Sequence, residues 1–205
     1  MIGGERVGAI VAAGGSGTRA GVPKQWLELG GATVLRRSAE AVAACELVDL
    51  VVAVVPRGDE ERAAAALAGL AKPVRVAAGG PARADSVRHG LAAAEGCALV
   101  LVHDAARPFA TPALARAVAL AAARDGAALA ALPASDTVKE SAPGAGGEAA
   151  RVGRTLDRRA LWLAQTPQGF RAEVLRRAFA EAGPDAAAAT DECALVERLG
   201  LPVAL

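Results

Sequence analysis

The stretch Ala9-Ile-Val-Ala-Ala-Gly-Gly-Ser-Gly-Thr-Arg-Ala-Gly-Val-Pro-Lys-Gln-Trp26 joins an apolar run to a glycine-rich, cationic segment. The apolar run, residues 7–12, contains small and β-branched residues without charge, which is typical of a strand covered on both faces of a parallel sheet. Three glycines follow it and allow the backbone to turn sharply and to point N–H groups at anionic oxygens: Gly14, Gly15 and Gly17. Arg19 adds a forked guanidinium and Lys24 a compact ammonium. The stretch therefore predicts a strand followed by a loop that binds the phosphates of a nucleoside triphosphate.

Three other interpretations of this loop are weaker. A P-loop has Lys and then Ser or Thr after its last glycine, whereas Thr18 and Arg19 stand here. The letters from 15 to 20 match the dinucleotide fingerprint, but that fingerprint expects an acidic residue about 20 positions on, and the next strand ends at 56–58 without one. An ordinary glycine-rich turn between a strand and a helix is the third alternative. The Pro-Lys-Gln sequel at 23–25 favours the phosphate-binding interpretation.

Apolar runs alternate with amphipathic segments along the chain. Strands are expected at residues 7–12, 48–55, 74–77 and 98–102, and helices at 33–44, 59–70 and from about residue 85. This alternation predicts an α/β fold with a Rossmann-like, doubly wound, mostly parallel sheet. Further helices are expected at 171–181 and from 190–192 onward. Since ligands of such sheets bind beyond the carboxyl ends of the strands, we expect the site there.

Two later strand ends carry polar groups. At residues 79–87 a Gly-Gly turn leads into a helix start, where Ser86 is either a helix cap or a donor to a ligand. At residues 103–108 a strand runs into His-Asp-Ala-Ala-Arg-Pro. Asp104 and Arg107 suit the neighbourhood of Mg²⁺ and phosphate, or they form an internal ion pair that closes the loop.

The composition changes between residues 133 and 159. The segment 140–148 is a turn-rich tip with short β-compatible pieces on either side, which predicts a β-hairpin arm. Because an isolated hairpin is marginally stable, such an arm normally packs on something. A surface loop without function is the alternative.

Length and composition exclude several classes of protein. The 205 residues, of which 53% are hydrophobic, suit one globular α/β domain, 1–205. A net charge of +1 and the absence of Tyr disfavour nucleic acid as a partner. No apolar run approaches the roughly 18 residues of a membrane span, and no secretory signal opens the chain, so we expect a cytoplasmic protein without a membrane partner. The three cysteines, Cys45, Cys97 and Cys193, are widely spaced and are expected to be core residues.

Several motifs resemble those of a known group of enzymes. Residues 12–19 with Pro23-Lys24 resemble the A-A-G-x-G-[ST]-R and P-K signature of the nucleotidyltransferase superfamily. Residues 102–108 resemble the V-H-D-A-A-R-P segment of one branch, the 2-C-methyl-D-erythritol 4-phosphate cytidylyltransferases of the non-mevalonate isoprenoid pathway. Further segments resemble that family in the same order along the chain: 80–87, 136–139, 155–158, 165–168 and 190–192.

The resemblance implies a fold of the nucleotide-diphospho-sugar transferase type and transfer of CMP from CTP to 2-C-methyl-D-erythritol 4-phosphate, with release of pyrophosphate. It assigns catalysis to Arg19, Lys24 and Arg158, with Mg²⁺ as the cofactor and Asp104 as the carboxylate near the metal. It assigns CTP binding to Ala12, Ala13, Gly14, Gly15, Ser16, Gly17, Gly80, Arg83, Ser86, Asp104 and Ala105. It assigns the acceptor to Arg107, Asp136, Thr137, Arg158 and Thr166.

The resemblance also implies a homodimer. In the family the arm, residues 135–158 here, hooks around a second subunit, and Arg158 is expected to reach the partner's site. Family members continue beyond the position of Leu205 with a segment that holds a lysine near the acceptor phosphate, and the three lysines here include no counterpart. We therefore expect a nucleotide half of the site that is intact and a C-terminal family segment that is absent.

Rival functions stay open on the sequence alone. A cytidylyltransferase for another alcohol or sugar phosphate, such as ribitol 5-phosphate, shares several of the motif letters. A non-catalytic nucleotide-binding protein is supported only by the missing lysine segment. A dehydrogenase is the remaining alternative, and binding of NADH would reveal it.

Overall fold

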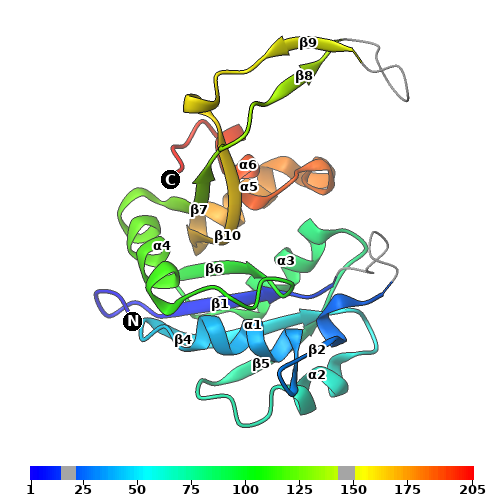
Figure 1. Cartoon of the computed structure of the whole chain (residues 1–205). Coiled ribbons are helices and arrows are strands. Elements are labelled where there is room, and N and C mark those ends of the chain that lie inside the picture. The colour runs from blue at the N-terminus through cyan, green and yellow to red at the C-terminus, as the bar shows by residue number, and fades with distance from the viewer. Residues whose placement is uncertain (15–21, 143–150) are drawn as a thin grey trace. The chain divides into compact units, whose positions relative to one another are not determined.

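The apolar run predicted as the first strand lies inside a six-stranded sheet (Figure 1). The computed structural model describes residues 1–14, 22–142 and 151–205. These residues form two compact units, the first built from 1–130 and 166–205 and the second from 131–165. The sheet has the order β5-β4-β1-β6-β10-β7, and its strands are β1 (Val7–Ala12), β4 (Val48–Val55), β5 (Val74–Ala78), β6 (Leu99–Asp104), β7 (Ala127–Pro133) and β10 (Trp162–Arg171).

Four neighbouring strands of the sheet run parallel. β1 pairs in parallel with β4 on one side and β6 on the other, and β4 pairs in parallel with β5. β10 runs antiparallel to β6, with Gln168 opposite Val102. The predicted mostly parallel α/β sheet is therefore confirmed.

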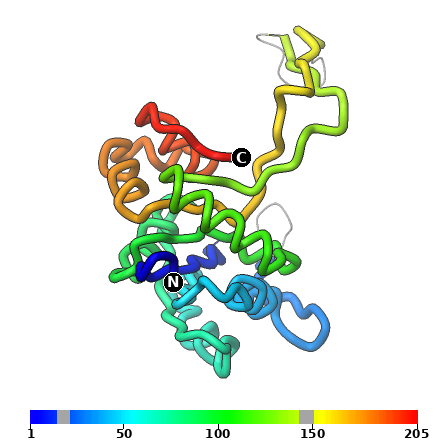
Figure 2. The backbone as a smooth tube through the Cα atoms, turned by 90° about the vertical axis from the view of Figure 1, so that its left-hand side faces the viewer, coloured from blue at the N-terminus to red at the C-terminus, as the bar shows by residue number. Residues whose placement is uncertain are grey.

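Helices cover both faces of this sheet, as a doubly wound fold requires. The helices of the first unit are α1 (Val34–Ala43), α2 (Glu60–Ala66), α3 (Arg83–Ala93), α4 (Pro112–Asp125), α5 (Ala172–Ala182) and α6 (Glu192–Arg198). Buried residues of α1 and α4 form one core with Val7, Ala9 and Val11 of β1. On the other face α3 lies over β1 and β4 through Gly90, since a Cβ there would meet side-chain methyls of Ile10 and Val54. Figure 2 follows the path from β1 in blue through α4 in green to the red C-terminal segment.

Short elements complete the first unit. They are the 3-10 turns η1 (Lys24–Trp26) and η3 (Gly183–Ala188) and the strand pair β2 (Glu28–Leu29) and β3 (Ala32–Thr33). Side chains of Thr33, Thr111 and Asp191 cap α1, α4 and α6 by accepting backbone N–H bonds, as N-cap residues do. Near the C-terminus, Ala204 pairs in parallel with Ala128 of β7.

Several helices and strands begin or end at residues other than those predicted. The helix expected at 59–70 ends at Ala66, the one expected from about 85 begins at Arg83, and the strand expected to end at 102 continues to Asp104. Of the elements that the sequence left unassigned, α4, β7 and β10 are the largest. The three cysteines are buried, as predicted, and all three are free thiols. None of the helices in the described ranges is long and apolar enough to cross a membrane.

The second unit contains the predicted hairpin. β8 (Lys139–Ser141) pairs antiparallel with β9 (Val152–Thr155), with Lys139 opposite Thr155, and the turn η2 (Arg158–Ala160) follows. Residues 143–150, which hold most of the predicted tip, lie outside the described residues.

Candidate active site

The carboxyl ends of the parallel strands meet at one edge of the sheet. Ala12, the last residue of β1, pairs with Asp104, the last residue of β6, and Val55 of β4 pairs with Ala78 of β5. Backbone bonds tie the loops that follow to neighbouring strands: Ala13 N–H donates to the Val54 carbonyl at 2.7 Å and Ala105 N–H to the Ala12 carbonyl at 3.0 Å. Three of the motifs found in the sequence therefore lie on one edge, as expected for a ligand site in this fold.

Ser86 joins two of these loops. Its Oγ accepts a hydrogen bond from Gly80 N–H at 3.1 Å and donates to the Ala82 carbonyl at 3.2 Å. A Cβ on Gly14 would come within 2.8 Å of this Oγ, and one on Gly79 within 2.9 Å, so glycine is needed at both positions for the loops to approach the hydroxyl. Ser86 is therefore not the helix cap that its position suggested, because the N-cap of α3 is Ala82 and Ser86 lies inside the helix.

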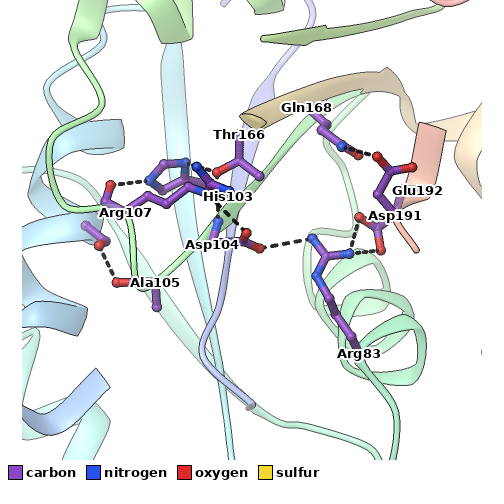
Figure 3. A network of polar contacts seen from close by, with 10 residues as sticks. Arg83, His103, Asp104, Ala105, Arg107, Thr166, Gln168, Asp191 and Glu192 are labelled. Atoms are coloured by element: carbon purple, nitrogen blue, oxygen red, sulfur yellow. Dashed lines mark hydrogen bonds and ion pairs between the residues drawn. The ribbon is translucent and has the colours of Figure 1, made fainter. Parts of the chain in front are cut away.

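His103 lies behind the loop that carries Asp104 and Arg107 (Figure 3). Its side chain is fully buried, with Nε2 3.0 Å from the Arg107 carbonyl oxygen and Nδ1 3.0 Å from Thr166 Oγ1. Thr166 Oγ1 also accepts the Asp104 N–H at 3.2 Å. The antiparallel strand β10 thus brings Thr166 to the edge formed by the parallel strands.

Arginine and carboxylate side chains alternate beside this loop (Figure 3). Arg83 donates from Nη1 to both oxygens of Glu192, at 2.6 and 2.7 Å, and from Nη2 to Asp104 at 3.1 Å. Asp104 also faces Arg107 Nε at 3.4 Å, so the internal ion pair considered for this loop is present. Gln168 Nε2 donates to Asp191 at 2.9 Å, and Asp191 caps α6.

Burial and neighbouring charges shift the pKa of three groups at this edge. Burial raises the pKa of the Glu192 carboxyl, and the charge and hydrogen bond of Arg83 oppose that shift. Burial acts to lower the pKa of Arg83, but the charges and hydrogen bonds of Glu192 and Asp104 outweigh it, so the pKa is raised and the guanidinium stays charged. Burial lowers the pKa of His103, which favours a neutral imidazole.

A magnesium ion at this edge would be coordinated by the protein and the substrate together. Among residues 1–14, 22–142 and 151–205 no group of three or more His, Cys, Asp or Glu side chains could hold a metal ion. Asp104 offers one carboxylate that is 32% exposed, whereas Glu192 is buried against Arg83. Because Mg²⁺ is commonly bound by one or two carboxylates and substrate phosphates, Asp104 suits the role of its single protein ligand.

The glycine loop is described only in part. Ala12, Ala13 and Gly14 lie at the edge, while Gly15, Ser16, Gly17 and Arg19 lie outside the described residues. Lys24 begins η1 and is exposed, and its ammonium makes no hydrogen bond or ion pair within the described part of the chain. It is therefore available to an anionic ligand.

The remaining predicted residues belong to the second unit. Asp136, Thr137 and Arg158 are exposed, and Arg158 Nη1 donates to the Ser135 carbonyl at 2.7 Å. This bond brings Arg158 next to the backbone that carries Asp136 and Thr137. The three residues are thus grouped within their own unit.

Sequence reasoning missed four residues that support the edge: Ser38, His103, Gln168 and Glu192. Ser38 Oγ donates to the Ala105 carbonyl at 2.5 Å from the middle of α1. His103, Gln168 and Glu192 stood inside recognised motifs, which was the one available signal, while nothing in the sequence pointed to Ser38.

Comparison with known proteins gives a consistent result. The family model described as "IspD: 2-C-methyl-D-erythritol 4-phosphate cytidylyltransferase" matches residues 7–205. The chain is 71% identical over its whole length to a bifunctional enzyme IspD/IspF of Anaeromyxobacter dehalogenans, of which it covers 52%. It is 44% identical to a 2-C-methyl-D-erythritol 4-phosphate cytidylyltransferase of Acidobacterium capsulatum, with 97% of this chain and 87% of that protein covered.

Solved structures agree with this similarity. A crystal structure of 2-C-methyl-D-erythritol 4-phosphate cytidylyltransferase from Thermus thermophilus superposes with a TM-score of 0.77 at 38% identity, covering 98% of this chain and 87% of that one. The chain spans about half the length of the bifunctional relative and most of the length of the single-function relatives.

Proposed function

Since the chain belongs to the 2-C-methyl-D-erythritol 4-phosphate cytidylyltransferase family, we propose that it transfers CMP from CTP to 2-C-methyl-D-erythritol 4-phosphate. The products are 4-diphosphocytidyl-2-C-methyl-D-erythritol and pyrophosphate, in a step of isoprenoid precursor biosynthesis. A reaction that consumes CTP suits the cytoplasm, which is the location we propose.

The observation that carries the proposal is the convergence of three loops at one edge of the sheet. The ends of β1, β5 and β6 place Gly14, Gly80 and Asp104 at this edge, with Ser86 between the first two. Closely packed glycines allow a nucleotide to approach the backbone of these loops, and the N-terminus of α3 lies at the same edge.

We assign the nucleotide to this edge. The residues that would hold CTP are Ala12, Ala13, Gly14, Gly80, Arg83, Ser86, Asp104 and Ala105, together with Gly15, Ser16 and Gly17 from the sequence motif. Arg83 already pairs with two carboxylates. Its role in CTP binding would be to keep Asp104 in place, or to release Asp104 and bind a phosphate of CTP instead.

The chemistry needs positioning and charge rather than a base. An oxygen of the acceptor phosphate attacks the α-phosphorus of CTP, and the bond from that phosphorus to the bridging oxygen breaks as pyrophosphate leaves. A phosphate monoester is largely ionised at pH 7, because its second pKa is about 6, so no proton has to be removed. Lys24 and Arg19 would stabilise the charge on the α-phosphoryl group and on pyrophosphate.

Magnesium and the acceptor complete the proposed site. Mg²⁺ held by Asp104 and the phosphates would neutralise charge on the triphosphate. The family resemblance assigns the acceptor to Arg107, Asp136, Thr137, Arg158 and Thr166, and we propose these roles for them. We also propose a homodimer formed through residues 135–158.

The test is pyrophosphate release from CTP and Mg²⁺ in the presence and absence of 2-C-methyl-D-erythritol 4-phosphate. The proposal expects release that depends on this acceptor. Release only with ribitol 5-phosphate or a sugar phosphate would assign a different acceptor. Tight CTP binding without release under any condition would contradict enzyme activity and favour a nucleotide-binding protein.

A further inference from the structure

Ser38 is a polar residue on the buried face of α1. Its side chain is fully buried, and its neighbours on that face, Leu35, Ala39 and Val42, belong to the hydrophobic core. A buried hydroxyl without a partner destabilises a fold, and a serine inside a helix commonly donates to the carbonyl four residues earlier. Ser38 instead donates to the Ala105 carbonyl at 2.5 Å, across 67 positions of the sequence. The hydroxyl therefore connects α1 to the loop that follows β6.

This loop leaves the core directly after the residue that Ser38 binds. Ala105 is 2% exposed, whereas Ala106 and Arg107 are exposed. Two hydrogen bonds hold Ala105 inside the unit, because its N–H donates to the Ala12 carbonyl at 3.0 Å and its carbonyl accepts from Ser38. Both peptide groups of Ala105 are therefore fixed before the chain turns outward to Arg107.

The bonds of this loop hold its two charged residues separately. Asp104 N–H donates to Thr166 at 3.2 Å and Ala105 N–H donates to β1, so the peptide groups on both sides of Asp104 have partners of their own. The bond from Ser38 fixes the next peptide group, the one that leads to Arg107. Loss of the Ser38 hydroxyl would therefore loosen the backbone at Arg107 and leave the backbone at Asp104 held.

We propose that Ser38 is a positioning residue for the acceptor: through the Ala105 carbonyl, its hydroxyl fixes the backbone from which the Arg107 side chain reaches the acceptor. Ser38 itself touches no ligand, because its one hydroxyl proton is donated to Ala105 and its side chain is fully buried. The kinetic consequence rests on the proposed function, in which Arg107 is assigned to the acceptor. The structural consequence concerns the free protein alone, so the two can fail separately.

The first experiment needs no substrate. Ser38→Ala removes the donor and leaves the Ala105 carbonyl without it. Amide hydrogen exchange, measured by NMR on the free protein, should then be about tenfold faster at Arg107 N–H than in the wild-type chain, the size of one lost hydrogen bond. Exchange of Asp104 N–H should stay within about twofold of its wild-type rate. An unchanged rate at Arg107 would overturn the proposal whatever the enzyme does.

Ala41→Gly is the matched control because it weakens the same helix without removing the bond. Ala41 is half-buried in α1, and a glycine inside a helix lowers stability by about as much as one lost hydrogen bond. This variant should lower the thermal unfolding midpoint about as much as Ser38→Ala does and leave exchange at Arg107 N–H at the wild-type rate. Equal acceleration at Arg107 in both variants would mean that general weakening of α1 is the cause, and the proposal would fail.

The second experiment separates the two substrates. Ser38→Ala should lower kcat/KM for 2-C-methyl-D-erythritol 4-phosphate about tenfold, while the dissociation constant for CTP, measured by direct binding, should stay within about twofold of wild type. In an Arg107→Ala background, Ser38→Ala should lower kcat/KM for the acceptor by less than about twofold further, because the side chain that it positions is gone. A further tenfold loss in that background, or an equal loss of CTP affinity, would refute the proposal.

If no acceptor supports turnover in the wild-type chain, the proposed function fails, while the exchange rates still decide whether Ser38 holds the loop. If Ser38→Ala does not fold, as judged by its unfolding transition, Ser38→Cys takes its place. A thiol fills a similar space and is a much weaker donor, so the same exchange rates are expected and decide in the same way.

Discussion

Lys24 is the lysine that follows the glycine-rich stretch. It is exposed, and its ammonium has no partner among the residues that the structure describes. Arg83 and Arg107, in contrast, face Asp104. The other two lysines of the chain lie elsewhere: Lys72 precedes the amino end of β5, at the opposite edge of the sheet, and Lys139 bonds Thr155 in the hairpin.

Replacing Lys24 by alanine should therefore affect turnover and leave the fold intact. We expect Lys24→Ala to lower kcat by about 100-fold to 1000-fold, the usual effect of removing one group that stabilises transition-state charge. The thermal unfolding midpoint should be unchanged because no side-chain hydrogen bond or ion pair with the described residues is lost. Lys72→Ala is the matched control and should keep full activity. Near-wild-type turnover in Lys24→Ala would remove this residue from the mechanism.

Arg83 and Glu192 form a pair whose loss should show in stability. Arg83→Ala leaves the Glu192 carboxylate buried without its counter-charge, and we expect a loss of about 3 kcal/mol at pH 8, toward the lower end for a buried pair because Arg83 is partly exposed. Burial then raises the pKa of Glu192 unopposed. A carboxyl with a higher pKa in the folded state stabilises the fold at low pH and loses that contribution as the pH rises through its folded pKa.

The deficit of Arg83→Ala should accordingly grow between about pH 5 and pH 8, measured by urea unfolding at each pH. The double variant Arg83→Ala with Glu192→Gln has no carboxyl to titrate and should lose this pH dependence. Equal deficits of Arg83→Ala at both pH values would contradict the assignment of Glu192 as the buried partner.

Single residues of this site could be predicted from the sequence where a polar side chain stands at the end of an apolar strand. Asp104 and Arg107 follow a strand end, and the structure places both at the edge of the sheet. His103 and Thr166 could not be paired from the sequence because their bond joins positions 63 residues apart, on strands whose antiparallel pairing was not foreseen. Ser86 was interpreted as a possible cap, and the tertiary contact with Gly80 decided its role instead.

At the scale of elements, Trp26 connects the lysine-bearing turn to a helix. Its indole N–H donates to Asp59, the N-cap of α2, at 3.1 Å, and the Arg62 guanidinium lies 4.1 Å from the centre of its ring. η1, which begins at Lys24, is thereby tied to α2. The position of Lys24 depends on this contact as well as on its own backbone.

Weakening the contact between Trp26 and α2 should lower catalytic efficiency, although no residue assigned to the ligand is changed. Trp26→Ala removes one hydrogen bond and one cation–π contact, each worth about 1 kcal/mol, and we expect kcat/KM for CTP to fall at least about tenfold. Trp26→Phe keeps a ring under Arg62 and should fall by a smaller factor. If Trp26→Ala kept wild-type kcat/KM, the turn would hold its position without α2.

Elements were predictable where their composition contrasted with their surroundings. The runs at 48–55 and 7–12, rich in β-branched residues and charged only at Asp49, form parallel strands as expected. α4 and β7 are dominated by alanine, which gives little contrast between a helix and a buried strand, so neither was assigned. β10 contains polar residues and Pro167 in its middle, which argues against a central strand, yet its second half pairs with β6.

At the scale of the whole molecule, the second unit exposes apolar side chains that a monomer would leave in water. Leu132, Val152, Trp162 and Leu163 are 57%, 62%, 48% and 51% exposed, and all four belong to residues 131–165. Exposed apolar side chains on an arm of this kind are what packing on a second subunit would cover. They support the proposed dimer, in which Arg158 of one subunit would serve the site of the other.

That division of the site between subunits can be tested with two inactive variants. If Arg158 acts in the partner's site, a heterodimer of Lys24→Ala and Arg158→Ala subunits contains one complete site, made from the intact Lys24 of one subunit and the intact Arg158 of the other. Heterodimers purified through different tags should then show about half the wild-type turnover, one working site of two, while both homodimers stay inactive. If Arg158 serves its own subunit, both sites of the heterodimer are damaged and activity does not return.

Val152→Glu, which places a charge on an exposed apolar position, should shift the equilibrium from dimer toward monomer in sedimentation and lower kcat/KM for the acceptor in proportion. A chain that sediments as a monomer and is fully active would contradict the dimer and the shared site together.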